Sequence, residues 1–204
     1  MQDEKQTGPS VRLTARGAAT RERIVSAAAD VMYAQGVAGT SLADVMAASG
    51  TGTSQLYYYF ADKDALVAEV VLLQIARMLE TQERLLGRVD SLLGLRRWRD
   101  AEVLEARGRQ RHGCALGSLA SELSCRSEQS RLALAEAMTT WEDYLRAALE
   151  RIQTKGEIRA DADPGILATG ILAALEGGLL LAQTSLDPTR LERALDAALL
   201  HLRA

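Results

Sequence analysis

Apolar residues recur at helical spacing along most of the chain, and the first clear example is the segment of residues 18–35. Its apolar positions are Ile24, Ala28, Val31 and Met32. They follow an i, i+4, i+7, i+8 pattern, which is the buried stripe of an amphipathic helix. Gly36 comes directly after the segment and is expected to stop this helix.

Two short helices and a long one are predicted next. Thr40 or Ser41 supplies the capping hydroxyl of a second helix that ends near Gly50. A third helix is expected around residues 53–59, and Asp62 caps a fourth helix of at least about 20 residues. Because so few residues join the second helix to the third, the two must cross at a large angle. This is the helix-turn-helix arrangement.

The rest of the chain carries further helical patterns. Residues 114–125 are rich in small side chains and predict a compact helix, and a long amphipathic helix is predicted over about residues 128–155. Asp163-Pro164 and Asp187-Pro188 each place a capping carboxylate before a first-turn proline. These two pairs predict where the last two helices begin.

The helix predicted over residues 164–184 has apolar side chains around most of its circumference. They are Ile166, Leu167, Ile171, Leu172, Leu175, Leu179, Leu180 and Leu181. Such a helix must be covered on two sides, and we expect a second copy of the chain to cover one of them. Gly177-Gly178 would let a partner backbone approach closely; alternatively, each glycine merely weakens the helix by about 1 kcal/mol. The pattern predicts a homodimer formed through the last two helices.

The composition favours an all-helical protein. Of the 204 residues, 48% are apolar and only three are proline. No apolar run reaches the roughly 18 residues of a membrane span, and the N-terminus lacks the apolar stretch of a signal peptide. We therefore expect a cytoplasmic protein with no membrane partner.

The charge is unevenly distributed, although the formal net charge is only −3. Between Lys5 and Arg23 there are five basic residues and one acidic residue. The basic residues are Lys5, Arg12, Arg16, Arg21 and Arg23. A polar tail that runs into a basic helix start is typical of an arm that binds phosphate groups. On charge alone, a solvated helix terminus explains the same pattern.

The sequence contains no arrangement typical of catalysis or metal binding. Cys114 and Cys125 would lie about 16 Å apart on one helix, and His112 and His201 are isolated. We interpret the cysteines as reduced thiols that pack as small apolar side chains, with a redox sensor as the alternative. Neither a nucleophile–base pair nor a glycine-rich phosphate loop is present. An enzyme is therefore not expected, and neither is a cofactor or a metal.

Four consecutive aromatic residues, 57–60, follow a short polar stretch. On one helical turn they point in every direction, so some must be buried while others face outward. Leu56 and Phe60 are four residues apart on one face and are the predicted core members. The preceding polar residues would then present small hydrogen-bonding groups to a partner.

These features resemble the DNA-binding domain of the TetR (tetracycline-repressor) family of bacterial regulators. The resemblance covers about residues 16–70 without a gap. The matching segments are Thr20-Arg21-Glu22-Arg23-Ile24, Ala27-Ala28, Gly36, Thr40-Ser41-Leu42-Ala43-Asp44-Val45, Ser49-Gly50, Leu56-Tyr57-Tyr58-Tyr59-Phe60 and Asp62-Lys63. Residues 1–13, which contain Gly8-Pro9-Ser10, are expected to be a disordered tail. For the rest of an all-α chain, the resemblance implies a three-helix helix-turn-helix DNA-binding domain (14–62) and a helical ligand-binding and dimerisation domain (63–204).

The resemblance also implies which residues contact double-stranded DNA. Thr40 resembles the residue that caps the second helix and contacts a phosphate, and Lys63 resembles one that begins the fourth helix near a phosphate. Together with two residues of the basic arm, the predicted DNA-binding set is Arg12, Arg16, Thr40, Thr53, Ser54, Gln55, Tyr57, Tyr58 and Lys63. An amide side chain matches adenine, and hydroxyl groups can donate to bases or phosphates.

The predicted function is a dimeric repressor that binds a pseudo-palindromic operator and is released by a small, mostly apolar effector. The effector pocket is expected between the fourth helix and the later helices. Its predicted lining is Met78, Trp98, Leu116, Met138, Trp141, Tyr144, Glu176, Leu179 and Gln183. Two alternatives stay open: the aromatic residues simply fill the core, or the chain is a constitutive regulator or activator without an effector.

Overall fold

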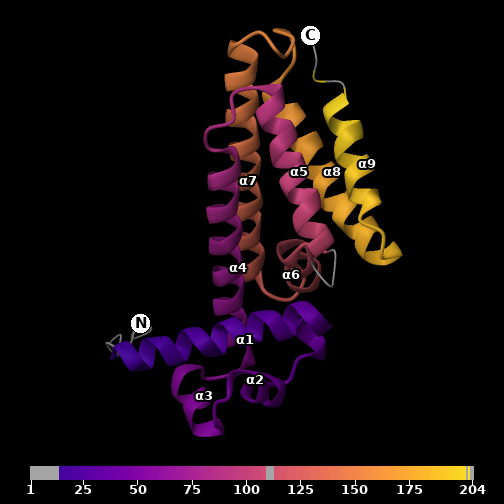
Figure 1. Cartoon of the computed structure of the whole chain (residues 1–204). Helices are drawn as coiled ribbons and strands as arrows, with labels where there is room; N and C mark the ends of the chain where they lie inside the picture. The colour runs from indigo at the N-terminus through magenta and orange to yellow at the C-terminus, as the bar shows by residue number, and fades with distance from the viewer. Residues whose placement is uncertain (1–13, 109–112, 201, 203–204) are drawn as a thin grey trace, which may run out of the picture.

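The computed structural model describes residues 14–108, 113–200 and 202, and these residues form nine α-helices and no strand. The helices are α1 (Ala15–Gly39), α2 (Leu42–Ser49), α3 (Thr53–Tyr59), α4 (Lys63–Leu86), α5 (Leu92–Gly108), α6 (Ala115–Leu123), α7 (Glu128–Thr154), α8 (Pro164–Ser185) and α9 (Thr189–Leu200). Figure 1 shows α1 lying across the lower end of the long helices, with α2 and α3 beneath it. The all-α prediction is confirmed.

The first helix begins slightly earlier than predicted. Thr14 caps it by accepting a hydrogen bond from the backbone N–H of Gly17 at 3.2 Å. Regular geometry breaks at Gly36, where φ is +81°, and one further turn follows. The predicted stop at Gly36 is therefore confirmed. The early start was missed because the first turn of α1 carries no apolar stripe.

The short helices form the predicted helix-turn-helix. Ser41 caps α2 and forms a capping box with Asp44. Gly50 ends α2 in the left-handed conformation, with φ of +63°. Gly52 is the N-cap of α3 and offers no side-chain acceptor, whereas Asp62 caps α4 by accepting from Ala65 N–H at 2.8 Å. Figure 1 shows α3 below α1, on the side away from the long helices.

Buried apolar side chains form two clusters. The first joins α1, α2 and α3 to the first half of α4, to α6 and to the start of α7, with Ile24, Leu56, Leu66, Leu119 and Leu134 among its members. The second joins the end of α4 to α5, α7, α8 and α9. Because α4 contributes to both clusters, it connects the core of the helix-turn-helix to the core of the bundle. A domain boundary at residue 62 stays a prediction.

The long apolar helix α8 packs against both α7 and α9. Its two adjacent glycines face different surroundings. A Cβ on Gly178 would lie 3.0 Å from Leu191 Cα, so Gly178 permits the close approach of α9. A Cβ on Gly177 would meet nothing within 4 Å. Gly177 therefore lies on the outer face of α8, and Gly178 serves packing within the chain.

Among the described residues, α8 is the one helix whose length and hydropathy would suffice to cross a bilayer. This agrees with the expectation that no uninterrupted apolar run reaches about 18 residues, because Thr169, Glu176 and Gln183 interrupt the run while the average hydropathy of the helix stays high. In the fold, 33% of its most apolar 18-residue window is buried. The core helix of a folded domain meets the same criterion, so this property does not by itself indicate a membrane.

Candidate functional site

The outer face of α3 carries an exposed set of polar and phenolic groups. Thr53, Ser54 and Gln55 are exposed, and Tyr57 and Tyr58 keep 53% and 67% of their surface accessible. The two residues assigned to the core, Leu56 and Phe60, are 0% and 2% exposed. The division of this turn into core and surface is therefore confirmed, and the five predicted α3 residues lie together.

The start of α3 is held by side-chain hydrogen bonds that replace a capping hydroxyl. Gln55 Oε1 accepts from the backbone N–H of Gly52 at 3.4 Å. Just before it, the hydroxyl groups of Ser49 and Thr51 form a buried hydrogen bond of 2.7 Å. Gln55 thus supports the helix while its side chain remains exposed.

The structure corrects the role of Thr40. This residue is only 3% exposed, and its hydroxyl donates to the carbonyl oxygen of Gly36 at 2.7 Å. Ser41 supplies the cap of α2 and is exposed. Because two adjacent hydroxyl residues give the same sequence signal, only the fold distinguishes them. Ser41 therefore replaces Thr40 as the candidate phosphate contact at the start of α2.

The basic arm divides into structural and exposed residues. Arg21 pairs with Glu69 at 2.6 Å and lies over the Phe60 ring, 5.4 Å from its centroid. Arg23 Nε donates to the carbonyl oxygen of Ser49 at 3.0 Å. Both side chains therefore hold α1 to neighbouring elements. Arg16 is exposed in the first turn of α1.

Arg12 and Lys63 are the two remaining basic residues that were predicted to contact DNA. Arg12 lies outside the described residues. Lys63 is partly buried, and its Nζ donates to the carbonyl oxygen of Val37 at 2.6 Å. One of its three N–H donors therefore ties α4 to the end of α1. A phosphate contact through the remaining donors stays a prediction.

A cavity of about 350 Å³ lies above α1, between α4 and the later helices. Four of the nine predicted lining residues border it: Met78, Leu116, Trp141 and Leu179. The other five do not border it, namely Trp98, Met138, Tyr144, Glu176 and Gln183. Trp98 instead stands behind the wall, where its indole Nε1 donates to Gln82 Oε1 at 3.0 Å.

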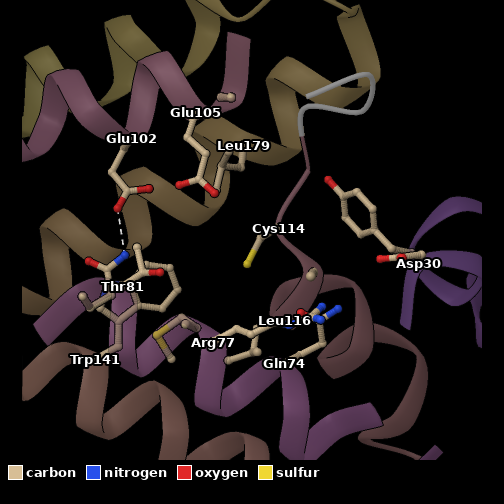
Figure 2. Close-up of a pocket in the computed structure, with 15 residues that line it drawn as sticks. Asp30, Gln74, Arg77, Thr81, Glu102, Glu105, Cys114, Leu116, Trp141 and Leu179 are labelled. Atoms are coloured by element: carbon tan, nitrogen blue, oxygen red, sulfur yellow. Dashed lines mark hydrogen bonds between the residues drawn. The ribbon is translucent and has the colours of Figure 1, made fainter. Parts of the chain in front are cut away.

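The cavity wall is more polar than predicted. Its polar members include Asp30, Gln74, Arg77, Thr81, Gln82 and Glu102, several of which are drawn in Figure 2. Gln82 is buried, and its Nε2 donates to Glu102 Oε1 at 2.8 Å, which satisfies part of its hydrogen-bonding capacity. A mostly apolar effector with few polar anchors therefore fits this wall poorly.

A signal for this wall was present in the sequence. Gln74, Arg77, Met78, Thr81 and Gln82 follow the i, i+3, i+4, i+7, i+8 pattern of a single helix face. A face that is polar but lies opposite other helices is a candidate binding wall. The contribution of α1 to the cavity had no local signal.

Next to the cavity, burial shifts the acid–base equilibria of a thiol and a carboxyl group. Burial, with the nearby Glu176 carboxylate, raises the pKa of the Cys114 thiol far above its ordinary value. Burial also raises the pKa of Glu176, whose Oε1 has no hydrogen-bond partner among the described atoms. Since the thiolate is the reactive form, Cys114 behaves as a packed, protonated side chain. This supports packing over redox sensing for that residue.

Within the described part of the chain, no group of three or more His, Cys, Asp and Glu side chains is arranged to hold a metal ion. The chemistry available at the two sites is hydrogen bonding, charge and apolar contact. These are the means of molecular recognition.

Two family models match the chain. "Bacterial regulatory proteins, tetR family" matches residues 24–70, and "Tetracyclin repressor-like, C-terminal domain" matches residues 94–198. The first match covers the helix-turn-helix and the start of α4. The second covers most of the helices around the cavity.

Individual relatives extend over most of the chain. The transcriptional regulator AcuR of Cereibacter sphaeroides is 29% identical over 82% of this chain and 78% of its own. The transcriptional repressor DhaR of a Mycobacterium species is 26% identical over 78% of this chain and 80% of its own. A TetR-family regulator from Agrobacterium tumefaciens has the same fold, with a TM-score of 0.83 at 20% identity, over 92% of this chain and all of that one.

Proposed function

Because the chain belongs to the TetR family of bacterial regulatory proteins, we propose that it is a cytoplasmic repressor that binds a pseudo-palindromic operator and is released by a small effector. Proteins of this family are DNA-binding transcriptional regulators rather than enzymes, and they bind DNA as dimers. The repressor role is supported by the relative DhaR, which is named a transcriptional repressor.

The observation that carries the proposal is the exposed face of α3. Its hydroxyl, amide and phenol groups stand on an α-helix, an element whose width fits the major groove of DNA. Gln55 is the candidate base-reading residue, because a carboxamide can pair with adenine through two hydrogen bonds. Ser41 and Arg16 are the candidate phosphate contacts beside it.

The proposed dimer face is the outer side of α8 and α9. Ile166, Leu180 and Leu181 of α8 and Leu200 of α9 are between 51% and 73% exposed in the single chain. Gly177 lies among them with open space above it. An exposed apolar surface of this kind is typical of a protein–protein contact.

The proposed effector site is the cavity above α1. A volume of about 350 Å³ is in the range of small-molecule sites. We propose an effector of mixed polarity, whose apolar part packs on Leu116, Trp141 and Leu179 while hydrogen-bonding groups meet the polar side chains of α4. Asp30 and Tyr33 of α1 also border the cavity, so a bound molecule would touch the DNA-binding helices directly.

Selection of duplexes from a random DNA pool tests this function. The protein should enrich a site with two-fold symmetry, and a gel shift should give one complex of dimer mass. A collection of small molecules can then be screened by tryptophan quenching and by loss of the gel shift. Enrichment without any releasing molecule would favour the constitutive regulator, and no enrichment at all would contradict the proposal.

A further inference from the structure

One carboxylate connects the bundle directly to the helix-turn-helix. Glu122, near the end of α6, accepts hydrogen bonds from the backbone N–H groups of Val37 and Ala38 at 3.1 Å each, one through each carboxylate oxygen. Both amides belong to the turn that follows the break in α1. Because the acceptor is charged, these bonds are stronger than those between neutral groups.

The backbone of this turn is shaped around that carboxylate. Gly36 has φ of +81°, and a Cβ at this position would lie 3.0 Å from Glu122 Oε1. Other residues rarely adopt such a φ. The same turn is held from a second side, since Lys63 donates to Val37 O at 2.6 Å. Residues 36–38 are therefore held by α6 and α4 in addition to the local hydrogen bonds from Thr40.

The position of residues 36–38 determines where α3, the proposed recognition helix, lies. It leads within three residues to Ser41, the N-cap of α2, and α2 is joined to α3 by the tight turn at Gly50. Between the Glu122 contact and α3 the chain contains only α2 and the short connections on either side of it. A displacement of the turn would therefore be passed on to the exposed residues of α3.

The opposite end of α6 borders the cavity. Cys114 is the N-cap of α6, and Cys114 and Leu116 line the cavity wall, with Cys114 in the middle of the view in Figure 2. Leu116 and Glu122 are six residues apart, which is about 9 Å along a helix. Figure 1 shows α6 directly above the end of α1. A single short helix thus reaches from the cavity to the turn.

A second contact joins the same two regions. The hydroxyl of Tyr33, on α1, donates to the carbonyl oxygen of Gly113 at 2.8 Å, just before α6. Leu119 and Leu123 of α6 pack in the same core as the helix-turn-helix. Both ends of α6 are therefore attached to α1, so α6 moves relative to α1 only if these contacts change.

We propose that Glu122 is a positioning residue that couples the cavity to the DNA-binding surface by holding residues 36–38 to α6. A molecule that displaces the Cys114–Leu116 end of α6 then moves the turn, and with it α3. This inference rests on the proposed function, because it assigns a route between the two sites proposed there.

Hydrogen exchange in the DNA-free protein tests whether Glu122 holds the backbone of residues 37 and 38. Glu122→Ala removes both acceptors, and the amides of Val37 and Ala38 should exchange about 10- to 100-fold faster, as expected for the loss of a hydrogen bond to a charged group. Glu136→Ala, at an exposed position on α7, removes the same charge and should leave both rates unchanged. Wild-type exchange rates in Glu122→Ala would overturn the proposal, whatever the protein's function.

Tryptophan emission tests the coupling. Both tryptophans, Trp98 and Trp141, lie in or behind the cavity wall, and coupling between two sites is reciprocal. Saturation with a duplex enriched by the wild-type protein should therefore change the emission. Glu122→Gln keeps the shape of the side chain. When this variant is saturated with the duplex, its tryptophan emission should change by less than about half as much as that of the wild-type protein.

Two results would overturn the coupling. One is a full emission change in Glu122→Gln, and the other is no change in the wild-type protein at saturation. Failure to enrich any duplex would count against the proposed function alone, because the exchange rates would still decide whether Glu122 holds the turn.

Discussion

The proposed recognition helix α3 has only seven residues, so a single side chain can have more than one role. Gln55 both supports the start of α3, through its bond to Gly52 N–H, and stands on the exposed face. Removing its side chain would therefore affect both helix stability and the proposed reading of DNA bases. Any test of base recognition at this position must separate the two.

We predict that Gln55→Ala weakens binding to the enriched duplex by about 1–3 kcal/mol and relaxes preference at one base pair in each half-site. Gln55→Glu is the matched control, since it keeps an acceptor for Gly52 N–H but loses the amide donor. It should lose the same base preference without weakening α3. The measurement is a gel shift over all single-base variants of the duplex; an equal loss on every variant would make Gln55 a positioning contact.

The buried carboxyl group of Glu176 makes stability depend on pH. Burial raises its pKa above the ordinary value of 4.5, so the folded state holds a proton that the unfolded state has released. Stability should therefore fall as pH rises through 4.5 toward the folded-state pKa. Glu176→Gln should be more stable than the wild-type protein near pH 8, with little difference near pH 4. Thermal unfolding across this range is the measurement, and a pH-independent difference would contradict it.

Single residues were predictable where spacing alone decides burial. Leu56 and Phe60 were separated from Tyr57 and Tyr58 by their places on one turn. Gln82 was not predictable as a buried residue, because its partners Trp98 and Glu102 come from α5. From sequence alone, a polar side chain is predicted to be exposed unless its hydrogen-bond partner is known.

At the scale of elements, helix ends were predicted best where a side chain caps the helix. Asp163 accepts from Gly165 and Ile166 at the start of α8, and Asp187 accepts from Thr189 at the start of α9. These bonds form between residues two or three apart, so the sequence contains both partners. The approach of two helices depends on residues that are far apart in the sequence. For this reason the sequence could not decide whether Gly177 and Gly178 permit a close helix contact or only weaken α8.

The two glycines of α8 should respond oppositely to the same substitution. Gly178→Ala places a Cβ 3.0 Å from the Leu191 backbone, and we expect a loss of about 1–3 kcal/mol in unfolding free energy. Gly177→Ala meets open space and should gain up to about 1 kcal/mol from helix propensity. Urea denaturation at one fixed protein concentration measures both. Equal effects would mean that α9 does not pack closely at Gly178.

At the scale of the whole molecule, the site of the cavity was the least predictable feature. Sequence placed the effector between α4 and the later helices, and four predicted residues do line the cavity. Asp30 and Tyr33 reach it from α1, which the sequence pattern assigned only to DNA binding. Their participation depends on how α1 lies across the bundle (Figure 1), an arrangement that no local pattern records.

The proposed dimer gives a further prediction at this scale. Gly177→Leu adds a large side chain to the outer face of α8, where it should separate two copies while leaving the single chain folded. Sedimentation should then show mainly monomer, and binding to the two-fold symmetric duplex should weaken at least about tenfold, because one half-site is lost per molecule. Gly177→Ala serves as the control for the backbone change. A Gly177→Leu protein that stays dimeric would place the interface elsewhere.

The uncovered apolar face of α8 also has a consequence for gene dosage. When the concentration of the chain is well below the dissociation constant of the dimer, most copies are monomers. Mass action then makes the dimer concentration vary with the square of the chain concentration. Halving the chain concentration then leaves about a quarter of the dimer. A halved rate of regulator synthesis would thus lower operator occupancy more than in proportion, so a gene under the proposed control would respond sharply to changes in regulator synthesis even before any effector binds.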